Sequence, residues 1–236
     1  MRARATVVAE RDGPRRTRCT TLRSAPPLSL RDTPDGLHVV GSAAGPLGGD
    51  DTLLQLTVAA GATLVVRNVA AQVVLPGVHP GPSFARVTAT VAAGATLLWL
   101  PEPLILAGRC DHRAEVTLSL DPSSSLVWRE EVVLGRGDEA TGSLLHRLRV
   151  DRAGHPLLRH DLALGPAWPG ACGPAGCGDA HVVGTVLVVG DAARTLVVPS
   201  VEGVRAAALR LADDAVLVTA LAQSRERLHD LLTRSL

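Results

Sequence analysis

Cysteine and histidine residues lie close together at two places in this chain, and both groups contain residue types that bind transition metals. One group is Cys172-x4-Cys177-x3-His181, in a segment rich in glycine and proline, and the other is the triplet Cys110–His112. Neither group has the ligand spacing of a common zinc site, and no fourth ligand is evident beside the first. Alternation along a strand puts the first and last residues of the triplet on one face, which also fits a surface turn. We therefore favour a structural role for both groups over metal binding.

Carboxylate side chains lie at the ends of turns and inside one apolar run. The loop Gly41–Asp51 ends in two glycines and two aspartates, and a flexible turn explains it equally well. Glu102 stands between two prolines, which hold its carboxylate at the end of a strand because proline cannot donate to a β-ladder. In the run that follows, Trp128 and Glu130 share one face of a strand while Arg129 and Glu131 share the other. One of the two glutamates is therefore expected to face the interior, where a structural ion pair with Arg136 is the alternative to a binding role.

The composition excludes several kinds of chemistry. All 24 basic residues are arginine, and the chain has no lysine and no tyrosine. A phosphate-binding lysine, a Schiff-base lysine and a tyrosine acid are thus impossible. The aromatic fraction of 2% and the net charge of +1 argue against nucleic-acid binding and against attraction to anionic membranes. No G-x-S-x-G motif is present, which disfavours hydrolase chemistry.

The cellular setting expected from the sequence is the cytoplasm. The first residues contain no apolar signal segment, and no uninterrupted apolar run reaches the roughly 18 residues that span a bilayer. Four cysteines in 236 residues do not form a disulfide framework, so we expect reduced thiols.

A repeated pattern indicates the elements that position these side chains. Thr57–Val66 reads TVAAGATLVV, Thr90–Leu100 reads TVAAGATLLWL, and Ser119–Trp128 reads SLDPSSSLVW. Each unit is an alternating strand, a turn of small residues and a second apolar strand, and the starts lie 33 and 29 residues apart. This rhythm predicts a mainly β protein, a stacked β-helix-like array in one domain over residues 1–236. A sandwich or barrel is the alternative.

The expected elements are about fifteen short strands and one or two helices. Thr63–Leu75 is predicted as one long strand, and Thr195–Val198 as a short one. Leucines at helical spacing predict a C-terminal helix over residues 223–236, with Ser224 as its N-cap. The segment 165–179 has five glycines and three prolines and is expected to be a loop.

Four segments occur in an order and spacing that resemble one known family. They read GPLGGDD at Gly45–Asp51, WLPEPLI at Trp99–Ile105, WREEVVLGR at Trp128–Arg136 and HVVGT at His181–Thr185. These segments are similar to the GGLLGGD, W-[LI]-P-[DE]-P-[LIV]-I, LGR-ending and H-x-x-G-T motifs of the urease accessory protein UreD family, also called UreH. The resemblance spans roughly residues 5–232. The matching motif positions are Gly48, Gly49, Trp99, Pro101, Pro103, Gly135, Arg136, Gly184 and Thr185.

The resemblance implies a scaffold rather than an enzyme. UreD proteins look like β-helical scaffolds that bind apo-urease and recruit the helical protein UreF, which in turn recruits the GTPase UreG. Nickel is thought to pass through a tunnel in UreD to the urease active site. This implies no tightly bound cofactor, with nickel in transit, and it agrees with the missing phosphate-binding lysine. The residues that this resemblance marks as transient nickel ligands are Asp50, Asp51, Glu102, Glu130, Glu131 and His181.

The sequence also departs from the family and leaves alternatives open. The polar TTQ-A-x-TK strand of the family reads VRNVAAQ at Val66–Gln72, and the loop 165–179 belongs to this chain alone. For His181, hydrogen bonding at the end of its strand is the alternative to metal contact. A β-helical carbohydrate-binding module or hydrolase is the second functional hypothesis, and a metal-storage or redox protein using the four cysteines is the third.

Overall fold

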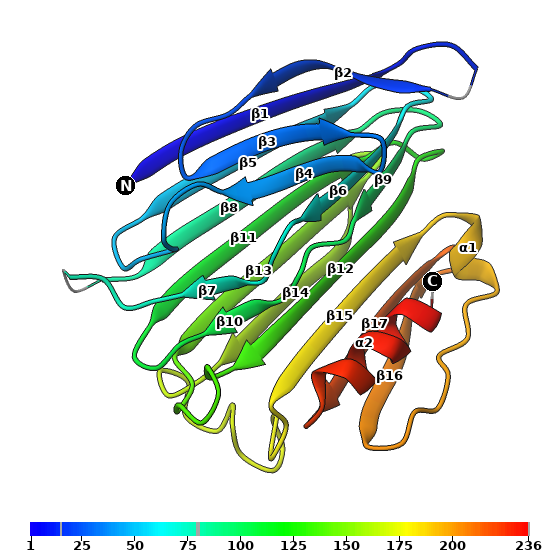
Figure 1. The fold of residues 1–236 in the computed structure, drawn as a ribbon. Helices are drawn as coiled ribbons and strands as arrows, with labels where there is room; N and C mark the ends of the chain where they lie inside the picture. Colours follow the sequence, from blue (N-terminus) through cyan, green and yellow to red (C-terminus); the bar gives the residue numbers. More distant parts are fainter. Residues whose placement is uncertain (15, 79–80, 236) are drawn as a thin grey trace.

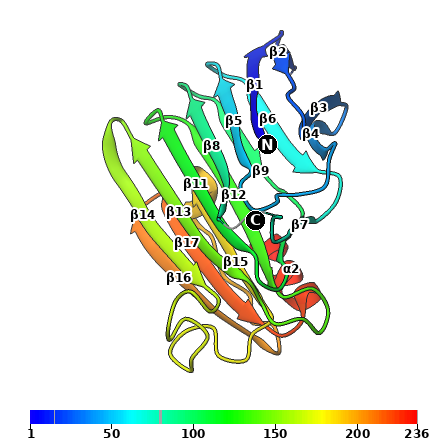
Figure 2. The same cartoon turned by 90° about the vertical axis from the view of Figure 1, so that its left-hand side faces the viewer.

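The strands of this protein form two sheets that face each other. The computed structural model describes residues 1–14, 16–78 and 81–235. Figure 1 looks onto one sheet, and Figure 2, turned by 90°, shows the other toward the viewer. Sheet A contains, in order, β14 (His155–Leu164), β13 (Ser143–Arg152), β11 (Asp111–Leu120), β8 (Ser83–Val91), β5 (Asp51–Val58), β1 (Arg2–Arg11) and β2 (Thr17–Arg23).

Sheet B is longer and carries a break on one side. Its continuous order is β16 (Val204–Ala212), β17 (Ala215–Ala222), β15 (Val182–Val189), β12 (Ser125–Leu134), β9 (Thr96–Trp99), β6 (Thr63–Asn68), β4 (Gly36–Gly41) and β3 (Leu28–Thr33). The short strands β7 (Gln72–Val74) and β10 (Leu104–Leu106) pair in parallel with each other, and β10 continues the ladder to β12. The helices are α1 (Asp191–Arg194) and α2 (Arg225–Arg234).

The chain alternates between the two sheets, so equivalent strands stack in parallel. In sheet A, Thr57 pairs with Thr90 and Thr90 pairs with Ser119. These are the first residues of the three sequence units, so each unit is one coil of the stack. In sheet B, β6, β9 and β12 follow the same rule. The predicted stacked β array is therefore confirmed.

Valine, leucine and alanine fill the space between the sheets. Leu97, Leu118 and Leu126 are almost completely buried there. Each such side chain contributes about 1.5–3 kcal/mol relative to an exposed position. Trp99 and Trp128 are register partners on β9 and β12, and their rings stack with centroids 4.6 Å apart and an interplanar angle of 4°.

Helix α2 packs on the outer face of β15 and β17 (Figure 1). Every residue of β15 is buried because one face contacts the inner core and the other contacts this helix, which explains its nearly continuous apolar sequence. The Ser224 side chain accepts a hydrogen bond from the Arg227 N–H, which confirms the predicted N-cap. In the described part of the chain, no helix has the length and apolar character needed to cross a membrane.

Two predicted strands are wrong. The segment Thr63–Leu75 is not one strand: β6 ends at Asn68 and the ladder resumes at Gln72. The interruption lies beside Leu100–Pro103, where the prolines break the neighbouring ladder as predicted. Thr195–Val198 is not a strand either, because the chain leaves β15 through α1 and reaches β16 without pairing there.

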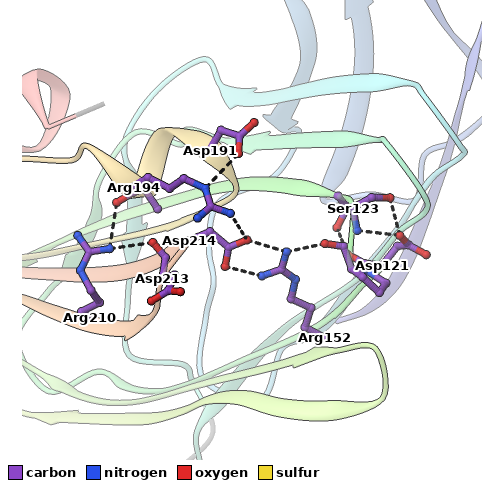
Figure 3. Close-up of polar contacts among 11 residues, drawn as sticks. Asp121, Ser123, Arg152, Asp191, Arg194, Arg210, Asp213 and Asp214 are labelled. Atoms are coloured by element: carbon purple, nitrogen blue, oxygen red, sulfur yellow. Dashed lines mark hydrogen bonds and ion pairs between the residues drawn. The ribbon is translucent and has the colours of Figure 1, made fainter.

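A polar cluster ties turns at one end of the two sheets together (Figure 3). Arg152, the last residue of β13, binds both carboxylate oxygens of Asp214 at 2.8 and 2.9 Å. Asp214 lies in the turn between β16 and β17, so this bidentate pair joins sheet A to sheet B. Arg152 also donates to the Pro122 carbonyl at 2.5 Å in the turn before β12. The cluster thus holds three turns from both sheets in one place.

Candidate functional site

A cavity of about 560 Å³ lies between the sheets. Side chains of β5, β8, β11 and β13 line it from sheet A, and those of β12 and β15 line it from sheet B. The lining also includes Asn68–Val73, Trp99 and Pro101–Glu102, which flank the break in sheet B. The interruption of the ladder thus puts irregular backbone and polar side chains in the wall of an otherwise apolar cavity.

An imidazole and a carboxylate face each other across this cavity. His146 Nε2 on β13 lies 3.0 Å from Glu130 Oε2 on β12, so the pair links opposite sheets. Burial opposes protonation of His146, but the Glu130 carboxylate raises the pKa of His146 above its ordinary value. The pair therefore brings an imidazole and a carboxylate, two potential metal ligands, into contact in the cavity.

A second imidazole lies in the same wall and has the opposite electrostatic environment. Burial, with the charges of His146 and Arg113, lowers the pKa of His112 to about 4, so its ring is neutral. His112 Nδ1 lies 2.8 Å from the Ser83 hydroxyl, which is also 3.4 Å from the Asp111 carbonyl. If the hydroxyl donates to that carbonyl, Nδ1–H donates to Ser83 and Nε2 keeps its lone pair.

Asp50 lines the cavity beside the glycine-rich loop. Its carboxylate accepts hydrogen bonds from the Met1 amino group at 2.5 Å and from the Leu47 N–H at 2.9 Å. Burial opposes ionisation of this carboxyl, but the two hydrogen bonds hold its pKa below the ordinary value. Gly48 in this loop approaches Gly77 so closely that an added Cβ would lie 2.8 Å from the Gly77 nitrogen.

A polar network on the outer side of sheet B joins the break to helix α2. Glu131 is buried under the helix; its Oε1 accepts a hydrogen bond from His229 Nδ1 at 2.7 Å, and its Oε2 forms an ion pair with Arg225 Nε at 3.4 Å. Arg225 also binds Glu102 at 3.0 Å, and Arg129 donates to the Pro101 carbonyl at 3.3 Å. Glu102 and Glu131 both belong to the cavity lining. The cavity wall therefore contains residues of two polar groups: an inner group between the sheets, with His146 and Glu130, and an outer group next to α2, with Glu102 and Glu131.

Strand alternation explains why the two neighbouring glutamates belong to different groups. Glu130 pairs with Thr185 on β15, and both line the cavity. Glu131 pairs with Gly184, on the face covered by α2. A Cβ on Gly184 would lie 2.6 Å from methyl carbons of Leu228 and Leu232, so the glycine makes room for the helix. The expected division of the glutamates between two faces is confirmed, but the outer one is also buried.

Other motif residues lie outside the cavity or make contacts different from those expected. Asp51 forms an ion pair with Arg86, and neither His181 nor Pro103 is among the lining residues. His181 has an exposed side chain, while its backbone N–H and C=O bond Ala222 and Leu134, which agrees with a role at the strand end. Arg136 does line the cavity, but it binds Glu139 at 2.6 Å rather than either glutamate of β12, so the expected ion pair is wrong. Gly49 and Gly135 have positive φ values of 88° and 89° and serve turns.

Sequence reasoning missed His146 and considered His112 only within the cysteine triplet. A signal was present, because His146 alternates with Leu144 and Leu148 on a strand face that is otherwise apolar. The sequence could not show that this face lies opposite Glu130, because the contact joins different sheets. Within residues 1–14, 16–78 and 81–235, no three His, Cys, Asp or Glu side chains gather as a metal site.

The fold and the cavity define a class: a stacked, two-sheet β protein with paired polar side chains along an internal cavity. Comparison with known proteins then gives the family. The model of the UreD urease accessory protein family matches residues 1–236, so the chain belongs to that family. The resemblance noted from the four sequence motifs is thereby confirmed.

Named relatives agree with this assignment. Urease accessory protein UreD of Parafrankia sp. is 42% identical over 247 residues, which cover 94% of this chain and 83% of that protein. Urease accessory protein UreD 3 of Streptomyces griseus is 40% identical over all of this chain and 96% of its own length. The UreD of Streptomyces coelicolor is 38% identical, again over 100% and 96% of the two chains.

Proposed function

We propose that this chain is a non-enzymatic urease accessory protein that acts in the cytoplasm and carries nickel in transit through its inter-sheet cavity to apo-urease. Its expected further partners are a UreF-like helical protein and a UreG-like GTPase. The observation that carries the proposal is the series of polar side chains in the cavity wall, above all the His146–Glu130 pair. Family membership favours this role over a carbohydrate-binding module or a hydrolase.

The chemistry of the lining suits a borderline metal ion that must leave again. Imidazole nitrogens bind Ni²⁺ well, and carboxylates add charge. Each polar position offers one or two ligand atoms, so water would complete the coordination sphere and exchange would stay easy. A cavity of about 560 Å³ also has room for a hydrated ion. Six waters at about 30 Å³ each occupy roughly 200 Å³.

The cavity residues have separable roles in this proposal. Binding of a cation by His146 needs its neutral imidazole, so the raised pKa of His146 means that the cation would compete with a proton there. His112 is already neutral and offers Nε2 without releasing a proton. Glu102 and Glu131 would receive the ion at the break in sheet B, in exchange for their contacts with Arg225. Nucleotide hydrolysis would belong to the GTPase, because this chain has no lysine for a phosphate-binding loop.

The test uses conservative variants of the cavity pair in cells that assemble urease. We expect Glu130→Gln and His146→Gln to lower the nickel content of purified urease several-fold, measured by elemental analysis. Co-purification with the accessory partners should be unchanged, because both side chains are enclosed between the sheets. Glu139→Gln is the matched control, since Glu139 is on the surface and its side chain binds Arg136 and the Gly108 N–H.

Two outcomes would contradict the proposal at different levels. Full nickel content with both cavity variants would reject the cavity as the path. Normal nickel content of urease in a strain that lacks this protein would reject the accessory role itself.

A further inference from the structure

The loop between β14 and β15 is compact and brings two cysteines together. It runs from Gly165 to Ala180 and contains Cys172 and Cys177. Its backbone folds back on itself, because the N–H of Cys177 donates to the Ala171 carbonyl at 2.9 Å and the N–H of Gly178 donates to the Gly173 carbonyl at 3.0 Å. Residue 177 therefore lies directly beside the peptide that precedes residue 172.

The two thiols differ in exposure. Cys172 is exposed, whereas Cys177 is 4% exposed and packs in a cluster of buried apolar side chains. Cys177 Sγ lies 3.1 Å from the Ala171 carbonyl, so its S–H donates there. Burial, and a contact with the Cys172 side chain, raise the pKa of the Cys177 thiol. Cys172 is thus the accessible nucleophile, and Cys177 is a protected thiol within its reach.

We propose that Cys172 and Cys177 form a site of oxidative modification, in which a hydroperoxide converts the two thiols into an intramolecular disulfide. The hydrogen bonds from Cys177 to the Ala171 carbonyl place its thiol beside the peptide that precedes Cys172, and a short separation of this kind is what a disulfide requires. No third side chain of the metal-binding types gathers there within the described residues, so the geometry favours oxidation over metal binding.

The reaction has two balanced steps. The Cys172 sulfur attacks one oxygen of the hydroperoxide, an S–O bond forms, the O–O bond breaks and an alcohol or water leaves. The Cys177 sulfur then attacks the Cys172 sulfur of the sulfenic acid. The S–S bond forms, the S–O bond breaks, and water leaves with the proton of Cys177. The two thiols together lose two electrons, which the hydroperoxide accepts.

The other two cysteines lack this combination. Burial and the neighbouring Asp32 raise the pKa of Cys19 to about 11. Burial and Asp111 raise the pKa of Cys110 to about 11, and Cys110 is 3% exposed. Thiolate is the reactive form, so both should react slowly.

Oxidation would take place in a loop that is tied to other elements. Arg205 on the edge strand β16 donates to the Cys177 carbonyl at 3.1 Å, and Gln223 before α2 donates to Asp179 at 2.8 Å. The disulfide would remove the hydrogen bond from Cys177 Sγ to the Ala171 carbonyl. It would therefore change how the loop is held against β16 and the segment before α2. This inference does not depend on nickel transit.

The experiment treats the reduced full-length protein with hydrogen peroxide and counts thiols after denaturation. The count is expected to fall from four to two. Trypsin cleaves this lysine-free chain only at arginine, so the peptide 160–194 contains both cysteines. That peptide should lose two hydrogen atoms in mass and regain them on reduction. Cys19→Ser is the matched control: its thiol count should fall from three to one, with the same mass change in the peptide 160–194.

Two variants separate the steps. Cys177→Ser should leave a sulfenic acid on Cys172 that dimedone traps, and Cys172→Ser should abolish the disulfide. Because Cys172 is exposed, its replacement does not threaten folding. A disulfide that joins Cys110 to Cys177, a dimer linked through Cys172, or an unchanged thiol count under peroxide that oxidises free cysteine would each overturn the proposal.

Discussion

Two histidines in one cavity wall show that burial alone does not decide the charge of a side chain. His112 and His146 are both buried on neighbouring strands of sheet A, yet their pKa values shift in opposite directions. His112 has a hydroxyl as its partner and two cationic neighbours, whereas His146 faces the Glu130 carboxylate. The same residue type therefore supplies a neutral ligand at one position and, at the other, an imidazole whose protonated form is favoured by a carboxylate.

The low pKa of His112 predicts a pH-dependent stability. Its folded pKa of about 4 lies below the ordinary value of 6.5, so its contribution is present above about pH 6.5 and is lost as the pH falls toward 4. Between about pH 7 and pH 5, linkage predicts a loss of about 2 kcal/mol that His112→Gln should not show. Denaturant unfolding of both proteins with a chelator present checks this. Equal pH slopes for the two proteins would contradict it.

At the scale of elements, β12 and β15 act as a two-faced wall. Their inner face carries Glu130 and Thr185 toward the cavity, and their outer face carries Glu131 and Gly184 toward α2. The alternation was readable from the sequence because a strand has a period of two. The burial of the outer glutamate was not, because it depends on a helix that returns from almost a hundred residues later in the chain.

Gly184 should be intolerant of a side chain. In Gly184→Val the new methyl groups would enter the space of Leu228 and Leu232, both completely buried, and overpacking of this kind costs about 1–3 kcal/mol. Hydrogen exchange should show faster opening of α2, and denaturant unfolding should show the lower stability. Gly41→Val is a suitable control, because the nearest atom to a Cβ at Gly41 is 3.9 Å away. Equal stability losses in the two variants would argue against the helix contact as the cause.

At the scale of the whole molecule, the repeat rhythm was the most reliable guide. The stacked units were predicted from Thr57, Thr90 and Ser119, which pair in register because each coil repeats the same turn. The break in sheet B was predicted at Pro101–Pro103, where the prolines cannot donate to the ladder. It was not predicted at Val69–Ala71, because nothing in the local sequence pattern shows that the ladder stops there. Of the cavity pair, Glu130 was predicted from the sequence and His146 was not, because the strands that face each other across two sheets are set by the tertiary fold.

The bidentate pair between Arg152 and Asp214, which joins the two sheets, should contribute to the stability of the whole fold. The side chains of Arg152 and Asp214 are only 20% and 17% exposed. Asp214→Ala leaves a partly buried guanidinium without its bidentate partner and should lower the free energy of unfolding by about 1–3 kcal/mol. Asp191→Ala, at the fully exposed end of the same cluster (Figure 3), should make no measurable difference. Denaturant unfolding distinguishes the two variants. A similar loss of stability in both would show that the Arg152–Asp214 pair contributes no more than the exposed Asp191 contact.

The stacked indoles of Trp99 and Trp128 give the cavity an optical reporter. Trp99 is in the cavity wall, and its ring lies flat against that of Trp128. The chain has only one other tryptophan, Trp168, and no tyrosine to obscure the signal. A paramagnetic ion that enters the cavity would quench the emission of this pair. Trp168→Phe would leave the cavity pair as the only tryptophan emitters, so fluorescence titration would follow occupancy of the interior directly in solution.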